Sequence, residues 1–236
     1  MRYGQLYSAA VLRPLAEQVA ALCEVHDDDV VCDLLYDSGE LSRALATRIQ
    51  AGTVYAVDTA LEVEDVRQQT RGTPSGVQLL VMDGCRVPLD DRSCDCVASL
   101  FTLGFSPAAV GEANRILRPA GRYLVATWDP DAPPAHEALL ARALSQHGRS
   151  SDYLQKVLWV PARFKDCIRL HDVVRFDGFT HYWAAMVTAR PFATDVAAMD
   201  EALLRRVRET VRAELERFAA ADGTYRLPVD ALLTTM

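Results

Sequence analysis

No stretch of this sequence is apolar for long enough to cross a membrane. A spanning helix needs about 18 consecutive apolar residues, and no run in the 236 residues approaches that length. The first residues lack the apolar region of a signal peptide, because Arg13, Glu17 and Gln18 interrupt them. Half of the residues are nevertheless hydrophobic. We therefore expect a folded, cytoplasmic protein with a substantial core and no membrane partner.

The sequence also lacks an excess of positive charge. Lysine and arginine together number 25, aspartate and glutamate 32, and the formal net charge is −7. General binding to a phosphate backbone depends on clustered basic residues. We therefore expect no nucleic-acid partner.

Signatures of metal sites and disulfide frameworks are missing as well. Cys94 and Cys96 form the one tight cysteine pair, with no second pair or histidine near them, and zinc sites need such further ligands. We expect no metal, and free thiols in or near the core of a cytoplasmic chain. No nucleophile elbow and no phosphate-binding GK[ST] loop is present.

What the sequence does contain is an alternation of short apolar runs with helical patterns. Short apolar runs typical of buried parallel strands occur at Val30–Leu35, Thr53–Val57, Val77–Met82, Cys94–Leu100, Tyr123–Thr127, Cys167–Leu170 and Leu227–Thr234. Helical periodicity occurs at Tyr7–Cys23, Leu41–Ile49, Glu62–Gln69, Ala108–Leu117 and Met199–Ala220. The alternation predicts an α/β fold with a doubly wound, mostly parallel, seven-stranded Rossmann-like sheet.

The regular alternation ends at a proline-rich stretch, Pro130–Pro134. We expect a single domain over residues 1–236, with a core at about 24–128 and 165–236. Helical lid segments are then expected at about 1–23, 129–164 and 171–200.

Three aspartates lie at the carboxyl ends of consecutive predicted strands: Asp33, Asp58 and Asp83. Aspartate is common wherever a strand meets a turn, so one alone indicates little. Three on one sheet edge indicate a ligand site, since ligands of open parallel sheets bind at the carboxyl ends of the strands. Asp58 lies 19 positions after Gly39, a spacing typical of an acid that binds ribose hydroxyls.

Four motifs resemble those of the class I S-adenosylmethionine-dependent methyltransferases, in particular the small-molecule, ubiquinone/menaquinone-type branch. They are Asp33–Gly39, GTVYAVD ending at Asp58, VMDGCRVPLDDRSCDCVASL over 81–100, and EANRILRPAGRYLVATW over 112–128. The resemblance implies S-adenosylmethionine or S-adenosylhomocysteine as cofactor. It also implies the following cofactor-binding residues: Asp33, Leu35, Asp37, Gly39, Asp58, Asp83, Gly84 and Ser99.

The first motif departs from the family pattern at two of its three glycine positions. Leu35 and Asp37 occupy the first two, and only Gly39 is kept. The family's glycines let the backbone approach the cofactor and can adopt positive φ. Leu35 adds bulk there, and Asp37 adds a negative charge near the expected carboxylate of the cofactor. Ala120 likewise replaces the first glycine of the family's Pro-Gly-Gly turn.

The resemblance places the substrate side on the first helix and on the segments after the fifth and sixth strands. The residues expected to line the substrate pocket are Tyr3, Tyr7, Phe101, Trp128, Tyr182 and Trp183. His181 and Tyr182 are the candidate catalytic residues. An alternative is that Trp183 and Phe179 only anchor a lid helix to the sheet.

Three functions follow as hypotheses, and whether the chain is an enzyme stays open among them. The first is a methyltransferase acting on a small, possibly secondary-metabolite, substrate. The second is a cyclase or pericyclase-type natural-product enzyme on the same fold, because fold does not fix function. The third is a non-catalytic pseudo-methyltransferase that supports a partner subunit. A homo-oligomer or a heteromer is compatible with all three.

Overall fold

The computed structural model describes residues 4–35, 38–59, 76–82, 86–101, 106–149 and 167–235. Contacts divide the chain into two compact units. The helical unit comprises Met1–Pro14, Trp128–Trp159 and Arg169–Ala231, and the sheet unit comprises Leu15–Thr127, Val160–Ile168 and Leu232–Met236. The expected single domain stays a prediction.

The strands form a seven-stranded sheet, in the order β3-β2-β1-β4-β5-β7-β6. Their bounds are β1 Val30–Leu34, β2 Thr53–Thr59, β3 Val77–Met82, β4 Cys94–Leu100, β5 Leu117–Trp128, β6 Cys167–Phe176 and β7 Tyr225–Thr235. β1 pairs in parallel with both β2 and β4. β3 pairs in parallel with β2, and β5 pairs in parallel with β4. The predicted Rossmann-like α/β sheet is confirmed, and its topological switch point lies between β1 and β4.

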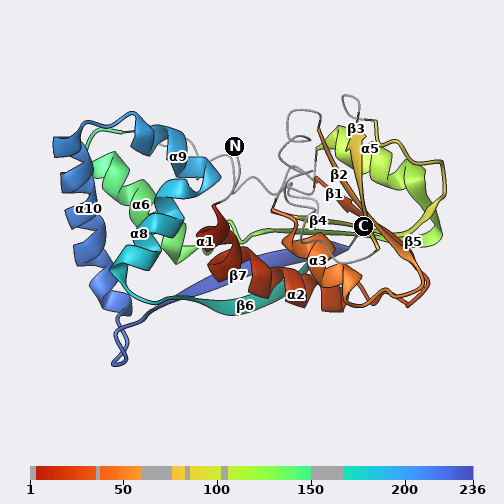
Figure 1. Cartoon of the computed structure of the whole chain (residues 1–236), viewed down its shortest axis with the longest axis horizontal. Helices are drawn as coiled ribbons and strands as arrows, with labels where there is room; N and C mark the ends of the chain where they lie inside the picture. The colour runs from red at the N-terminus through yellow and green to blue at the C-terminus, as the bar shows by residue number, and fades with distance from the viewer. Residues whose placement is uncertain are drawn as a thin grey trace. The chain divides into compact units, whose positions relative to one another are not determined.

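The two faces of β1 have different partners. Cys32 and Leu34 join a buried cluster with Val97 of β4 and with Ala113 and Ile116 of α5 (Pro107–Ile116). Asp33 points to the opposite face, because side chains alternate along a strand. On that face it meets α3 (Glu40–Ala46), through a hydrogen bond with Ser42. The strands and helices can be followed in Figure 1.

Arg115 anchors α5 to the turn before β4. Its guanidinium donates to Val87 O and Leu89 O, each at 2.8 Å, and pairs with Glu112 at 2.7 Å and Asp91 at 2.8 Å. Ser106 caps the amino end of α5 by accepting from Ala109 N, and Pro107 follows it.

β5 begins six residues earlier than the apolar pattern predicts, because a bulge separates its two halves. Cys94 pairs with Leu117 and Cys96 with Arg122, so the register shifts between them. Ala120 has a left-handed backbone with φ 68°. Gly121 next to it has no room for a side chain, since a Cβ would lie 2.9 Å from Arg118 O. The turn thus keeps the conformation that a glycine at position 120 would take without strain.

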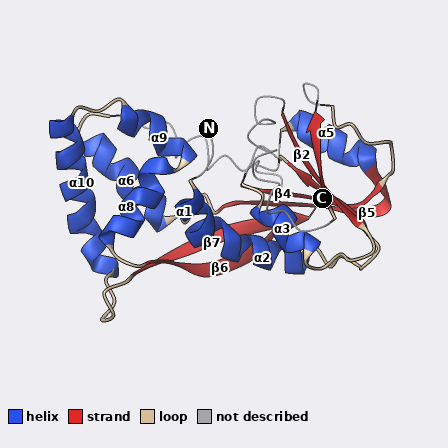
Figure 2. Ribbon diagram, in the orientation of Figure 1, coloured by secondary structure: helices blue, strands red, loops and turns tan. Residues whose placement is uncertain are grey.

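The helical unit contains α1 (Gln5–Tyr7), a π-helical stretch (Ser8–Leu12), α6 (Ala135–Gln146), α8 (Phe179–Thr188), α9 (Arg190–Ala197) and α10 (Glu201–Leu215). Figure 2 shows α6, α8, α9 and α10 lying together. Asp200 caps α10 by accepting from Leu203 N at 2.7 Å, and Val207, Val211 and Leu215 form its buried stripe. α2 (Arg13–Leu22) completes the helical stretch predicted at Tyr7–Cys23.

Two further differences from the predicted elements concern their length. β6 continues to Phe176 rather than Leu170, and α10 ends at Leu215, followed by a 3₁₀ turn at Glu216–Phe218. The helix predicted at Glu62–Gln69 lies outside the described residues. Where the structure is described, no helix combines the length and the apolar character that crossing a bilayer requires.

Candidate functional site

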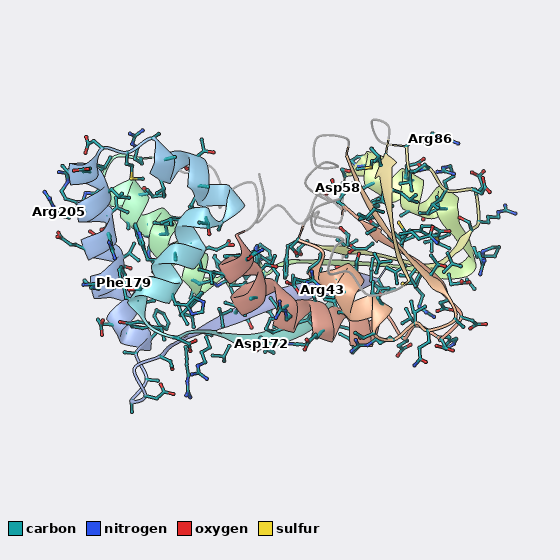
Figure 3. The ribbon with its side chains drawn as sticks, in the orientation of Figure 1. Arg43, Asp58, Arg86, Asp172, Phe179 and Arg205 are labelled. Carbon is teal, nitrogen blue, oxygen red and sulfur yellow. The ribbon has the colours of Figure 1, made fainter. Side chains whose placement is uncertain are left out.

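The carboxyl ends of β1, β2 and β4 bring three predicted site residues to one region of the sheet unit. Asp33 pairs in register with Ala56 of β2 and Ala98 of β4, so Asp58 and Ser99 follow on the neighbouring strands. Asp33 and Ser99 are buried, whereas Asp58 is only half-buried. Figure 3 labels Asp58 at the end of β2. This is the switch-point edge at which doubly wound sheets bind their ligands.

Asp33 is tied to the helix that follows its strand. Ser42 Oγ donates to Asp33 Oδ2 at 2.6 Å, and both side chains are buried. Glu40, in the first turn of α3, is also buried and pairs with Arg43 at 2.8 Å. An acid there is favoured by the positive end of the helix dipole. These bonds fix the position of α3 against β1.

The connection from β1 to α3 has a left-handed backbone at both of its described motif positions. Leu35 has φ 64° and Gly39 has φ 76°. A non-glycine residue in this region costs roughly 1–2 kcal/mol. Leu35 is half-buried and packs against the cluster that contains Cys32, Leu34 and Val57. Leu35 therefore has the left-handed backbone conformation that a glycine adopts without strain, while its side chain contacts the core.

Four predicted site residues cannot be placed. Asp37, Asp83 and Gly84 of the cofactor set, and Tyr3 of the substrate set, lie outside the described residues. Phe101 is described at the end of β4; it is half-buried, with φ 50°, and its N–H donates to Ala126 O at 2.9 Å.

Three predicted substrate residues, Tyr7, Trp128 and Tyr182, meet in the helical unit around His136. The ring centroids of Tyr7 and Trp128 lie 5.7 Å and 5.8 Å from that of His136. Tyr182 Oη donates to the backbone carbonyl of His136 at 2.7 Å. All four side chains are buried. The structure thus gathers residues that are far apart in the sequence into one cluster.

The centre of this cluster is polar and includes Glu137, which is fully buried. Tyr7 Oη donates to Glu137 Oε1 and lies 3.3 Å from His136 Nε2. The one hydroxyl proton of Tyr7 is donated to Glu137. The Tyr7 oxygen can therefore only accept a hydrogen bond from His136, so Nε2 is the ring nitrogen that carries the hydrogen. His136 Nδ1 is then the bare nitrogen, and it has no hydrogen-bond partner among the described residues.

Burial determines the protonation of this cluster. It lowers the pKa of His136 to about 3, so the ring is neutral at neutral pH. The approach of His136 Nε2 to Glu137 Oε1, at 3.9 Å, is therefore not an ion pair under those conditions. Burial, with a smaller contribution from Glu137, raises the pKa of the Tyr182 hydroxyl well above its ordinary range.

His181 lies apart from this buried centre. Its Nδ1 accepts from the backbone N–H of Asp177 at 3.1 Å, and its ring meets Phe176 edge-on at 5.6 Å. The imidazole thereby closes the turn that begins α8. This contact leaves Nδ1 as the unprotonated nitrogen and gives His181 a structural role at the start of the helix.

Trp183 stacks on Phe179 with a centroid distance of 6.1 Å. The guanidinium of Arg212 lies 4.2 Å above Phe179, and that of Arg208 lies 5.8 Å from Trp183. These stacks join α8 to α10, which Figure 3 marks with Phe179 and Arg205. The contacts thus hold α8 against α10 within the helical unit, whereas the alternative stated from the sequence had Trp183 and Phe179 anchor a lid helix to the sheet.

Sequence reasoning did not identify Ser42, Glu40 or Glu137. Ser42 sits one turn into an ordinary helical pattern, and Glu40 is a common first-turn acid. His136-Glu137 opens a helix after Pro133-Pro134, and an acid in a first turn normally faces water. The available signal was that most of α6 is apolar, since six further residues from Ala138 to Leu144 are buried.

Comparison with known proteins agrees with this geometry. Residues 33–125 match the family described as "Methyltransferase domain". The ubiquinone/menaquinone biosynthesis C-methyltransferase UbiE of Paraburkholderia phymatum is 34% identical over 140 residues, which cover 54% of this chain and 56% of that protein. The malonyl-[acyl-carrier protein] O-methyltransferase of Marinomonas sp. is 26% identical over 121 residues, covering 50% of this chain and 45% of that one. The chain thus spans about half the length of these curated relatives.

Two solved structures share the fold. A candidate type II methyltransferase from Anaeromyxobacter dehalogenans has a TM-score of 0.60 at 17% identity, covering 99% of this chain and 95% of that one. A candidate methyltransferase from an antibiotic biosynthesis pathway of Anabaena variabilis has a TM-score of 0.59 at 15% identity, covering 99% and 100%.

The sheet order defines a Rossmann-like fold, with Asp33 and Asp58 near the carboxyl ends of β1 and β2. Residues 33–125 match a methyltransferase domain and the curated relatives named above are methyltransferases, and both findings support a class I S-adenosylmethionine-dependent methyltransferase.

Proposed function

We propose that this protein is an S-adenosylmethionine-dependent methyltransferase that acts on a small molecule. The observation that carries the proposal is the position of Asp58. It stands half-buried at the carboxyl end of β2, beside the switch point and within the matched methyltransferase domain. A carboxylate there is suited to accept hydrogen bonds from ribose hydroxyls.

The described residues fit the nucleoside part of the cofactor. Asp58 would hold the ribose, and Gly39, left-handed at the start of α3, leaves room for close backbone approach. When bound, the cofactor supplies an electrophilic methyl group. The task of the chain is to orient the acceptor, exclude water and provide a place for the acceptor's proton.

Leu35 bears on whether the altered motif can hold the cofactor in the family's usual pose. Its packing against the core cluster supports the view that its bulk is directed away from a ligand. The negative charge of Asp37 is then the main remaining obstacle, because a like charge near the cofactor carboxylate opposes binding.

The test is calorimetric titration with S-adenosylmethionine and S-adenosylhomocysteine. We expect binding at ligand concentrations of about 1 mM or below, and weaker binding after Asp58→Asn. Asp28→Asn is the matched control, since it removes an exposed charge before β1, at the opposite end of that strand. If neither ligand binds at that concentration, the proposed function fails.

A non-methylating enzyme on the same fold is the second candidate. Two observations favour it: Leu35 and Asp37 replace two motif glycines, and the helical unit has an aromatic and polar centre. A protein that binds an aromatic ligand but neither cofactor form would favour this candidate over the methyltransferase. A stable heteromer on purification would instead favour the pseudo-methyltransferase.

A further inference from the structure

The phenol of Tyr7 occupies a buried, polar position that a small molecule could equally fill. Its hydroxyl donates to Glu137 Oε1 and lies 3.3 Å from His136 Nε2. All three side chains are fully buried within the helical unit. Hydrogen-bond donors stabilise a buried carboxylate, and the Tyr7 hydroxyl is one such donor to Glu137.

We propose that Glu137 and His136 form a recognition site for the phenolic hydroxyl of the methyl acceptor, and that Tyr7 is an internal stand-in for that phenol. The description of the ligand as a methyl acceptor rests on the proposed function. The recognition of a phenol at this site does not.

The donors and acceptors of the site match a neutral phenol. Its O–H donates to Glu137 Oε1, and its oxygen accepts from His136 Nε2, as those of Tyr7 do. Trp128, with its ring 5.8 Å from that of His136 at an angle of 74°, supplies an aromatic wall.

The segment that follows Tyr7 departs from regular α-helical hydrogen bonding. Residues Ser8–Leu12 form a π-helix directly after Tyr7, closed by the bond from Arg13 N to Ser8 O. Such stretches close their hydrogen bonds over five residues instead of four and often occur at functional sites. Conversion of this stretch to an α-helix rotates the residues before it by about 100°. We expect such a rotation to withdraw the Tyr7 hydroxyl from Glu137.

The experiment compares 4-methylphenol with toluene by calorimetry on the wild-type protein, Tyr7→Phe and Tyr225→Phe. Tyr7→Phe keeps the ring but removes the competing hydrogen bond to Glu137 Oε1, so we expect 4-methylphenol to bind about tenfold more tightly. Tyr225 Oη also donates to a glutamate, Glu216 Oε1, at 2.7 Å. Tyr225→Phe therefore makes the same chemical change elsewhere, and we expect it to leave the affinity unchanged.

Toluene lacks the hydroxyl, and we expect it to bind weakly and equally to all three proteins. Equal binding of toluene and 4-methylphenol, or no gain from Tyr7→Phe, would overturn the proposal. Glu137→Gln on the Tyr7→Phe background should weaken 4-methylphenol binding about tenfold. Near-ultraviolet circular dichroism checks its fold. If that variant does not fold, the comparison of Tyr7→Phe with Tyr225→Phe still decides the matter.

A parallel titration with S-adenosylhomocysteine separates this inference from the proposed function. Binding of 4-methylphenol without the cofactor product supports the phenol site and rejects methyl transfer. Binding of the cofactor product without 4-methylphenol supports the methyltransferase and rejects the phenol site.

Discussion

Ser42 Oγ donates a hydrogen bond to Asp33 Oδ2 at 2.6 Å, with both side chains buried. The bond joins the carboxyl end of β1 to α3. The loop between these two elements carries the altered glycine motif. Asp33 was predicted from the sequence as a cofactor-binding residue. Its contact with Ser42 also gives it a role in fixing the local geometry of the loop.

We predict that Ser42→Ala lowers the free energy of unfolding by about 2 kcal/mol. The reason is that a buried carboxylate then loses a charge-assisted hydrogen bond. Urea denaturation monitored by circular dichroism measures the change. Ser145→Ala, at an exposed position of α6, is the matched control and should change stability by less than about 0.5 kcal/mol. Equal effects of both variants would show that the bond contributes nothing specific.

Ala120→Gly should stabilise the protein by about 0.5–1 kcal/mol, because the left-handed backbone at φ 68° strains an alanine and not a glycine. Ala120 is exposed, so little packing is lost. Ala213→Gly, within α10, is the opposite-sign control: it should destabilise by up to about 1 kcal/mol. Thermal and urea denaturation of the pair test this. A loss of stability in Ala120→Gly would reject strain at this turn.

The sheet could be predicted from the sequence because each buried strand is a local apolar run. Val30–Leu34 and Cys94–Leu100 carry that signal within a few residues. The bulge that brings Leu117 into β5 could not be predicted from the sequence. It arises from pairing across the sheet with Cys94 and Cys96 of β4. In the candidate site, Asp58 was predictable from spacing. Glu137 was not, because its burial depends on Tyr7, which is 130 positions away in the sequence.

Asp37→Asn should tighten S-adenosylhomocysteine binding by about three- to tenfold at low salt, since it removes one like charge near the expected carboxylate of the ligand. Asp37 lies outside the described residues, so the expectation rests on its place in the motif. The gain should shrink as salt screens the repulsion. Asp28→Asn makes the same charge change before β1 and should leave the affinity unaltered. A gain in both variants would point to net charge rather than to the loop.

His136 makes stability depend on pH in a direction that its burial determines. Its folded-state pKa of about 3 lies below the ordinary value of 6.5. Below about pH 6.5 the unfolded chain binds a proton that the folded chain does not. The contribution of neutral His136 to the free energy of unfolding is therefore fully present above about pH 6.5, and it declines as the pH falls towards 3. Between about pH 8 and about pH 5 the wild type should lose about 2 kcal/mol through this group.

The His136→Asn variant should lack that loss, even if its stability at about pH 8 is lower because a buried ring has been truncated. The quantity to compare is the difference in unfolding free energy between the two pH values, measured by urea denaturation at each. His26→Asn is the control: His26 is exposed, so the variant should keep the wild-type pH dependence. An unchanged dependence in His136→Asn would mean that the ring gains a proton in the folded protein. The hydrogen bonds assigned to Tyr7, His136 and Glu137 would then need the opposite protonation.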